Sequence, residues 1–306
     1  MKLLIIYNPH AGHGKATKLL SKVKAYLELR SIDFQLQLTQ YQGHAWEIAE
    51  NADFSQFQGI IACGGDGTVF EVLNGYQRNS AINKPAMGII PNGTGNAFVR
   101  DMEYQPGDWK KGIDTLLNAS KKMIDVGKFT TANETYYFIN ILGFGFISDV
   151  NEESIKYKWM GNFAYILAVF TALIRLKSYP LQIKIDGELL QRDNIFVEIS
   201  NSRYTGTTFL MAPQAELDDG FLDVTLLNKV NRRRILKVFP TIFSGKHKQF
   251  EEVEVFKAKK IKVLGPKNMK LSPDGELLAE TPFEVECLQQ QLTLFWPQHL
   301  LTKSEL

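Results

Sequence analysis

Over residues 1–120, short apolar runs alternate with longer segments that carry apolar residues on one helical face. Apolar or alternating runs that predict strands lie at residues 3–7, 34–39, 60–63 and 86–90. Residues 16–30 and a stretch that begins at Thr68 follow the helical spacing. Four strands that alternate with helices predict a parallel sheet with helices on both faces.

From residue 121 onward the pattern consists of short strands separated by turn residues. These predicted strands lie at residues 124–130, 136–141, 181–185, 195–199, 221–227, 253–256, 261–264, 283–285 and 292–295. Strands at this spacing predict an antiparallel sandwich. We therefore expect an α/β domain over residues 1–125 and an all-β antiparallel sandwich over residues 126–306.

The most specific stretch is Gly64-Gly65-Asp66-Gly67, which separates a predicted strand from the helix that begins at Thr68. Glycines let a ligand lie directly on the backbone, and the start of a helix favours a phosphate. Asp66 would repel phosphates, so it indicates a contact through Mg²⁺ or water, or a partner lysine. The alternative is a capping box in which Glu71 reaches back to the cap, and the two interpretations are compatible.

Two further loops follow predicted strands. Residues 8–15 contain two glycines, with Lys15 as a candidate counter-charge for phosphate, but they lack the Walker A pattern. His10 and His13 have no other metal ligand beside them, so a solvated loop is favoured there. Residues 91–100 begin with a turn signal. Because the carboxyl ends of parallel strands share one edge of a sheet, we expect all these loops to lie together.

Two acidic turns occur in the second half of the chain. Residues 216–221 hold three carboxylates, which suit either a turn before a strand or a hard cation. Residues 272–276, Ser-Pro-Asp-Gly-Glu, contain a strong turn signal. The same Asp-Gly-Glu-Leu-Leu occurs at residues 186–190, where a hairpin explains it, so spacing alone assigns catalysis to neither copy.

Residues 64–68, with Glu71, Asn74 and Gly75 after them, resemble the nucleotide-binding signature of the diacylglycerol kinase catalytic-domain family. This family includes bacterial lipid kinases and sphingosine kinases, and NAD kinases and phosphofructokinases carry related signatures. The resemblance therefore implies a first domain of the NAD kinase and phosphofructokinase type.

Residues 91–100 resemble the second block of the family. Many bacterial members have Asp where this chain has Ala97, whereas sphingosine kinases have alanine. The alanine is compatible with two interpretations. The acceptor lipid could have a different head group, or the polar network around Asp66 could be weaker.

The resemblance also implies the residues of a nucleotide site in a cleft between the domains. These are Asn8, Pro9, His10, Ala11, Gly12, Thr39, Gly64, Gly65, Asp66, Gly67, Thr68, Glu71, Asn74, Gly93, Thr94 and Asn96. The implied catalytic residues are Asp66, Asp274 and Glu276, with Glu276 as the general base for an acceptor hydroxyl.

A structural Mg²⁺ site is implied at the first acidic turn. Its ligands would be Asp219 and the backbone oxygens of Glu216 and Phe221. A plain turn is the equally weighted alternative.

The composition is that of an ordinary globular protein, with 44% hydrophobic and 22% charged residues among 306. A net charge of +2 gives no support for a nucleic-acid partner. The two cysteines, Cys63 and Cys287, form no disulfide framework or metal knuckle, and no export signal begins the chain, which suits a reducing cytoplasm. The longest uncharged stretch, residues 159–174, is too short to span a bilayer.

Apolar residues with basic flanks also raise the question of a membrane surface. Trp159 and the apolar positions up to residue 176 recur at helical spacing between Lys156 and Lys177. They suit a membrane-surface helix at the inner face of the membrane, or a core helix, which the pattern favours. Arg232–Arg234 form a second basic cluster, for which a solvated face is favoured over anionic lipid. The sequence leaves open whether the chain forms a homodimer.

We therefore predict a lipid kinase that uses ATP and Mg²⁺ and transfers the γ-phosphoryl group to a lipid hydroxyl of diacylglycerol, phosphatidylglycerol or sphingoid type. One alternative is a kinase of the NAD kinase type with a soluble substrate. The other is a lipid- or nucleotide-binding regulator without catalysis, for which Ala97 is the only hint.

Overall fold

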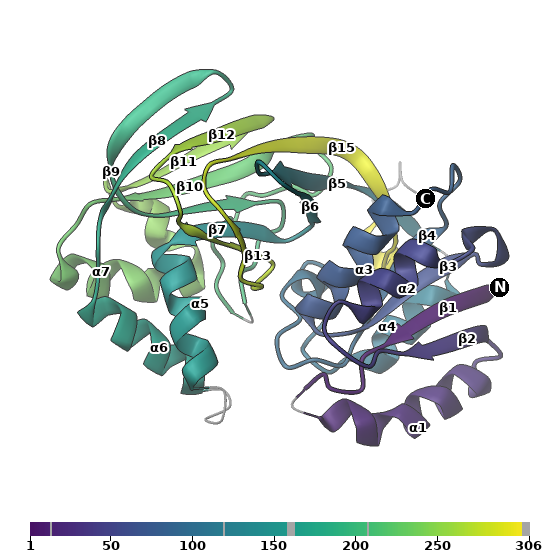
Figure 1. The fold of residues 1–306 in the computed structure, drawn as a ribbon. Coiled ribbons are helices and arrows are strands. Elements are labelled where there is room, and N and C mark those ends of the chain that lie inside the picture. The colour runs from purple at the N-terminus through teal and green to yellow at the C-terminus, as the bar shows by residue number, and fades with distance from the viewer. Residues whose placement is uncertain (13, 119, 158–162, 207, 302–306) are drawn as a thin grey trace. The chain divides into compact units, whose positions relative to one another are not determined.

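The computed structural model describes residues 1–12, 14–118, 120–157, 163–206 and 208–301 (Figure 1). The chain forms two compact units, Met1–Asp125 with Gln290–Leu306, and Val126–Gln289. It passes from the first unit to the second within strand β5 (Lys121–Thr130) and returns within β15 (Phe283–Phe295).

Residues 290–301 belong to the first unit, whereas the sequence pattern placed them in the second. The end of β15 pairs in parallel with β4 (Ala86–Pro91) through Leu294 and Met87. Phe295 is buried in the core of the first unit. Strand periodicity identified this segment, but periodicity does not say which sheet a strand joins.

The first unit is built on four parallel strands in the order β4-β3-β1-β2. Their bounds are Lys2–Tyr7 for β1, Asp33–Leu38 for β2 and Gly59–Gly64 for β3. All residues of β3 and β4 are buried, because helices cover both faces of the sheet. The predicted α/β architecture is confirmed.

Four α-helices of the described residues cover this sheet. They are α1 (Lys15–Leu29), α2 (His44–Asn51), α3 (Asp66–Arg78) and α4 (Trp109–Leu117). Helices α1 and α4 share one core with the sheet, and α2 and α3 lie against each other on the opposite face (Figure 1). Gly75 permits this close approach, because a Cβ there would lie 2.2 Å from the carbonyl oxygen of Trp46.

The second unit is antiparallel throughout its described strand pairs, which confirms the predicted sandwich class. Its strands are β6 (Thr135–Phe138), β7 (Ile141–Gly145), β8 (Tyr179–Ile185), β9 (Glu188–Ser200), β10 (Leu222–Asn228), β11 (Val253–Ala258), β12 (Lys260–Gly265), β13 (Lys270–Pro273) and β14 (Leu278–Glu280). Buried and exposed positions alternate along β8, as expected for a strand with one solvated face.

Three α-helices pack on β9 and share a single apolar core with it. They are α5 (Phe146–Lys156), α6 (Phe163–Ile174) and α7 (Arg232–Val238). Helix α7 was missed from the sequence, although its cap was readable: the Asn231 side chain accepts a hydrogen bond from the Arg234 backbone N–H at 2.9 Å.

Helix α6 contributes buried residues to this core, including Val169 and Ala172, as the core-helix interpretation predicts. Its Phe170 and Ile174 are exposed. Trp159 and Lys158, which entered the sequence pattern, lie outside the described residues. No helix among the described residues has the length and hydropathy needed to cross a membrane.

Candidate active site

The loops that follow the four parallel strands meet at one edge of the sheet, as predicted. The backbone N–H of Asn8 donates to the carbonyl of Cys63 at 2.9 Å, and that of Thr39 donates to Tyr7 at the same distance. The N–H of Asn92 donates to Gly64 at 3.2 Å. These bonds join the carboxyl ends of neighbouring strands, where ligands bind in open α/β sheets.

The glycines of the β3–α3 loop are required by close packing. A Cβ on Gly64 would lie 2.2 Å from Thr68 Oγ1, and a Cβ on Gly93 would lie 2.5 Å from the Cα of Gly65. The two loops therefore touch backbone to backbone, and larger residues would force them apart. Helix α3 begins directly after Gly65, and the start of a helix favours an anion through its backbone N–H groups and its dipole.

Neighbouring loops hold the start of α3 in place. Asn8 Nδ2 donates to Thr68 Oγ1 at 2.9 Å, which joins the β1 loop to the helix. A Cβ on Gly12 would lie 3.0 Å from the carbonyl oxygen of Asn92, so the first loop also approaches the third. His10, whose N–H donates to Asn8 Oδ1, and Thr94 are exposed at this edge.

The Asp66 carboxylate is the first residue of α3 and reaches the β4 loop. Its Oδ1 accepts a hydrogen bond from the backbone N–H of Ala97 at 2.8 Å. The contact uses the backbone of residue 97, so the alanine in place of the aspartate common in bacterial relatives leaves it intact. A Cβ on Gly95 would lie 2.8 Å from Asp66 Oδ2, which explains the small residue there.

Two buried amide oxygens in the β4 loop have no hydrogen-bond partner among the described residues, namely Asn92 Oδ1 and Asn96 Oδ1. The Asn96 amide Nδ2 donates to the carbonyl of Gly64 at 2.9 Å, so its oxygen lies beside the glycine loop. Mg²⁺ in phosphate sites is held by one or two carboxylates together with phosphate oxygens and water. The Asp66 carboxylate is a ligand of that kind, although no cluster of three or more His, Cys, Asp or Glu suited to a metal occurs in the described ranges.

Glu71 does not close a capping box on its own helix. Its two carboxylate oxygens accept hydrogen bonds from the backbone N–H groups of Gly43, at 2.8 Å, and Ala45, at 3.2 Å. These groups are at the start of α2, so Glu71 caps the neighbouring helix and fixes the loop that follows Thr39. The capping-box interpretation was wrong because it considered only local sequence.

Two other predicted nucleotide contacts are buried. Thr39 is 6% exposed, and Asn74 is fully buried two turns into α3, where its Nδ2 donates to the carbonyl of Phe70 at 2.9 Å. Asn74 therefore lies in the middle of helix α3, away from the loops at the sheet edge.

Asp274 and Glu276 belong to the second unit, in the turn between β13 and β14. Asp274 is 6% exposed, and its Oδ1 accepts hydrogen bonds from the backbone N–H groups of Asn140, at 3.2 Å, and Ile141, at 2.9 Å. Glu276 is partly exposed, and its N–H donates to Pro273 at 2.8 Å. Asp274 thus fixes the turn that carries Glu276.

The repeated turn at residues 186–190 has the same backbone geometry. Asp186 and Asp274 both have a φ of +46°, and the carboxylate of Asp186 accepts backbone N–H bonds from Lys259 and Lys260. The difference is burial, because Asp186 is exposed at a hairpin tip and Asp274 is enclosed. Tertiary structure therefore separates two copies that the sequence could not.

The turn predicted to hold a structural Mg²⁺ is occupied by an ion pair. Asp219 Oδ1 accepts the N–H of Phe221 at 3.0 Å, and its Oδ2 pairs with the ammonium of Lys257. Burial raises the pKa of nearby Asp223 to about 6, with Asp219 and Glu216 adding to the rise and Lys257 opposing it. Lys257 therefore neutralises part of this acidic turn, and the Mg²⁺ site at Asp219 stays a prediction.

A buried acid in the second unit was missed from the sequence. Glu198 on β9 is 1% exposed and accepts hydrogen bonds from Thr205 Oγ1 at 2.6 Å and Ser200 Oγ at 3.1 Å. Burial raises the pKa of its carboxyl to about 7. It lines an apolar cavity of about 60 Å³ with residues of α5, α6 and α7. The available signal in the sequence was a single carboxylate within the apolar run at residues 195–199.

The fold consists of an α/β unit, whose loops meet at one edge of a parallel sheet, and an antiparallel second unit. The profile of the diacylglycerol kinase catalytic domain matches residues 2–129, and that of the YegS C-terminal NAD kinase beta sandwich-like domain matches residues 140–296. The chain belongs to the diacylglycerol kinase family, which is a family of lipid kinases, as its signature residues predicted.

Several relatives resemble the chain over nearly its full length. A diacylglycerol kinase of Bacillus subtilis (strain 168) is 31% identical over 296 residues, with 96% of each chain covered. A diacylglycerol kinase of Mycobacterium tuberculosis (strain H37Rv) is 30% identical over 302 residues, which is 97% of this chain and 96% of the relative. A crystal structure from Bacillus anthracis str. Sterne, provisionally described as a diacylglycerol kinase, superposes with a TM-score of 0.79 at 26% identity and covers 98% of both chains.

Proposed function

We propose that this protein transfers the γ-phosphoryl group of ATP, with Mg²⁺, to the hydroxyl of a diacylglycerol. The observation that carries the proposal is the loop edge of the first unit, where the start of α3 and two closely packed glycine loops lie beside the Asp66 carboxylate. The names of the relatives support diacylglycerol as the acceptor.

Each residue at the loop edge then has a defined task. The N–H groups at the start of α3 bind phosphate oxygens, and Asn8 orients that turn through Thr68. Asp66 would hold Mg²⁺, directly or through water. When bound, Mg²⁺ neutralises the charge on the phosphate oxygens during transfer.

Glu276 is the proposed general base, which takes the proton of the acceptor hydroxyl as the oxygen attacks phosphorus. Asp274 acts as a positioning residue, because its buried carboxylate fixes the turn through the backbone of Asn140 and Ile141. Glu71 positions the second loop through the start of α2.

The test is phosphoryl transfer from labelled ATP to diacylglycerol, phosphatidylglycerol, ceramide and sphingoid bases, with NAD as the soluble acceptor. We expect phosphatidic acid from diacylglycerol. Glu276→Gln should lower kcat by about 10²- to 10⁴-fold, the usual contribution of a general base. The matched control is Glu188→Gln, which changes the same residue in the repeated turn at residues 186–190 and should leave kcat unchanged. Absence of transfer to every lipid would remove the proposal.

A further inference from the structure

The loop that follows β2 contains a rigid turn. The backbone N–H of His44 donates to the carbonyl of Tyr41 at 3.2 Å, and Gly43 has a φ of +90°, a conformation that favours glycine. The carboxylate of Glu71, on α3, accepts the backbone N–H of Gly43 at 2.8 Å. The turn is therefore fixed both by its own backbone and by a neighbouring helix.

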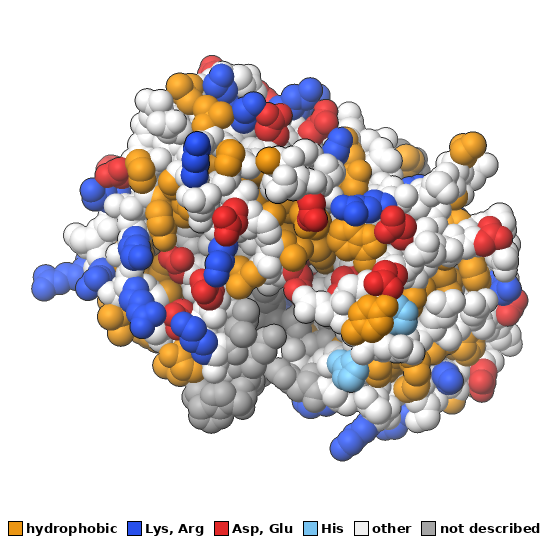
Figure 2. Space-filling model, in the orientation of Figure 1, with side chains coloured by type: hydrophobic (Ala, Val, Ile, Leu, Met, Phe, Trp, Pro, Cys, Tyr) orange, Lys and Arg blue, Asp and Glu red, His pale blue; other side chains and the backbone are white. Residues whose placement is uncertain are grey.

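Two aromatic rings are stacked on this turn. The ring centroids of Tyr41 and His44 lie 4.7 Å apart, and the ring planes differ by 14°. The Tyr41 hydroxyl donates to Glu47 at 2.6 Å, and His44 Nδ1 accepts the backbone N–H of Gln40 at 3.0 Å, so both rings are held in place. Tyr41 is nevertheless 53% exposed, so the part of its ring that His44 does not cover is open to a ligand. Histidine and hydrophobic side chains lie next to each other on the surface of the first unit (Figure 2).

The loop that carries this pair begins level with the glycine loop at the same edge of the sheet. Tyr7 of β1 pairs with Leu38 of β2 on one side and with Cys63 of β3 on the other. Neighbouring strands are about 4.8 Å apart, so the β2 and β3 loops begin about 10 Å from each other. An extended nucleotide spans a similar distance between its β-phosphate and its base. Nucleotides bind outside the carboxyl ends of the strands in open α/β sheets.

We propose that Tyr41 stacks on the adenine base of ATP and that His44 supports the tyrosine ring from its other face. The inference rests on the proposed function, which places the phosphates at the start of α3. A ligand that reaches both places must join phosphates to a planar ring, as ATP does. Stacking of a base on an aromatic side chain contributes about 5- to 150-fold in affinity.

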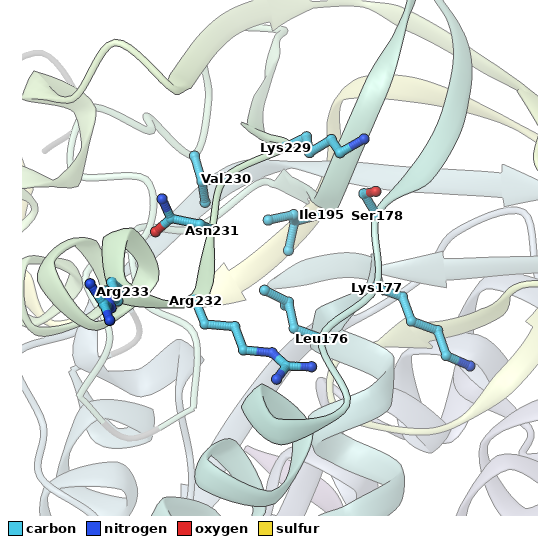
Figure 3. A pocket seen from close by; sticks show the side chains of 9 residues that line it. All are labelled: Leu176, Lys177, Ser178, Ile195, Lys229, Val230, Asn231, Arg232 and Arg233. Carbon is cyan, nitrogen blue, oxygen red and sulfur yellow. The ribbon is translucent and has the colours of Figure 1, made fainter.

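The second unit offers basic side chains without such a ring. A hollow of about 600 Å³ lies between residues 176–178, after α6, and residues 229–233, at the start of α7 (Figure 3). Lys177, Arg232 and Arg233 are among its lining residues, and no aromatic residue is among the described residues that line it. A triphosphate held there by charge alone would gain nothing from its base. A comparison of ATP with inorganic tripolyphosphate therefore separates the two sites.

The test is equilibrium binding of the full chain to Mg-ATP and to inorganic tripolyphosphate, measured by calorimetry without lipid. Tyr41→Ala should weaken ATP binding about 5- to 150-fold and leave tripolyphosphate binding unchanged, because only ATP carries a base. Tyr41→Phe keeps the ring and should bind ATP as the unmodified chain does. In the transfer assay Tyr41→Ala should raise the KM for ATP and leave kcat unchanged, as expected when binding to substrate and transition state is lost equally.

Two control variants should bind ATP as the unmodified chain does. Tyr137→Ala removes a partly exposed tyrosine from β6, and Arg232→Gln/Arg233→Gln removes charge from the hollow of the second unit. Weaker ATP binding in the arginine variant, with no change in Tyr41→Ala, would place the nucleotide at that hollow and overturn the proposal.

Two further outcomes would overturn the stacking role. One is an equal loss of ATP and tripolyphosphate binding in Tyr41→Ala with a lower thermal stability, which would show that the aromatic pair only fixes the turn. The other is an equal loss of ATP binding in Tyr41→Phe and Tyr41→Ala, which would assign the effect to the hydroxyl. Binding is measured without an acceptor, so a protein that binds ATP through Tyr41 but phosphorylates no lipid would refute the proposed function alone.

Discussion

Glu198 should make the stability of the protein depend on pH in a direction opposite to that of most carboxylates. Its pKa rises from an ordinary value of 4.5 to about 7 in the folded chain, chiefly because burial disfavours the charged form. Between these values the folded state binds more protons than the unfolded state, so the free energy of unfolding falls as pH rises. At 1.36 kcal/mol per pH unit, the expected loss is about 3 kcal/mol.

The perturbation is Glu198→Gln, which keeps the shape of the side chain and an oxygen that accepts a bond from Thr205. Near pH 5 the glutamate is protonated in the fold, so the two proteins should have similar unfolding free energies. Above pH 8 the variant should be more stable by about 3 kcal/mol, because it has no charge to bury. Only the difference between the two proteins is interpreted, since their other ionisable groups are shared.

The assay is urea unfolding of both proteins, followed by circular dichroism at half-unit steps from pH 5 to pH 9. Glu280→Gln, at an exposed position of β14, is the control for the exchange of a carboxylate for an amide. A difference between Glu198→Gln and the parent that stays constant over this range would refute the claim that Glu198 is buried with a raised pKa.

Three further predictions concern the loop edge. Asp66→Asn should lower kcat/KM by at least about 100-fold and raise the Mg²⁺ concentration needed for half-maximal transfer, measured in the ATP assay; an unchanged Mg²⁺ requirement would place the cation elsewhere. Glu71→Ala should lower the free energy of unfolding by about 1–2 kcal/mol and raise the KM for ATP, because α2 loses its cap; a change in kcat alone would argue for direct catalysis. Gly93→Ala should destabilise the fold more than Gly65→Ala in thermal unfolding, because the new Cβ atoms would lie 2.5 Å and 3.7 Å from the opposing glycine; equal effects would contradict the close loop contact.

Much of the first unit was predictable because its signals are local. Buried runs at residues 3–7, 60–63 and 86–90 identify strands, and their alternation with helices predicts that they are parallel. The convergence of loops at one edge then follows from topology. The partner of Glu71 was not predictable in this way, because the N–H groups that it binds are 28 and 26 residues away in the chain.

The sequence by itself determined the alternation of strands and helices, the change to antiparallel strands, and the glycine signature that identifies the family. Only the tertiary structure decided that residues 290–301 return to the first unit, that Asp219 pairs with Lys257, and that one of two identical turns encloses its aspartate. The physical reason is the sequence separation of the interacting residues. Backbone periodicity and glycine conformation depend on neighbours in the chain. Burial, pKa and ion pairing depend on neighbours in space.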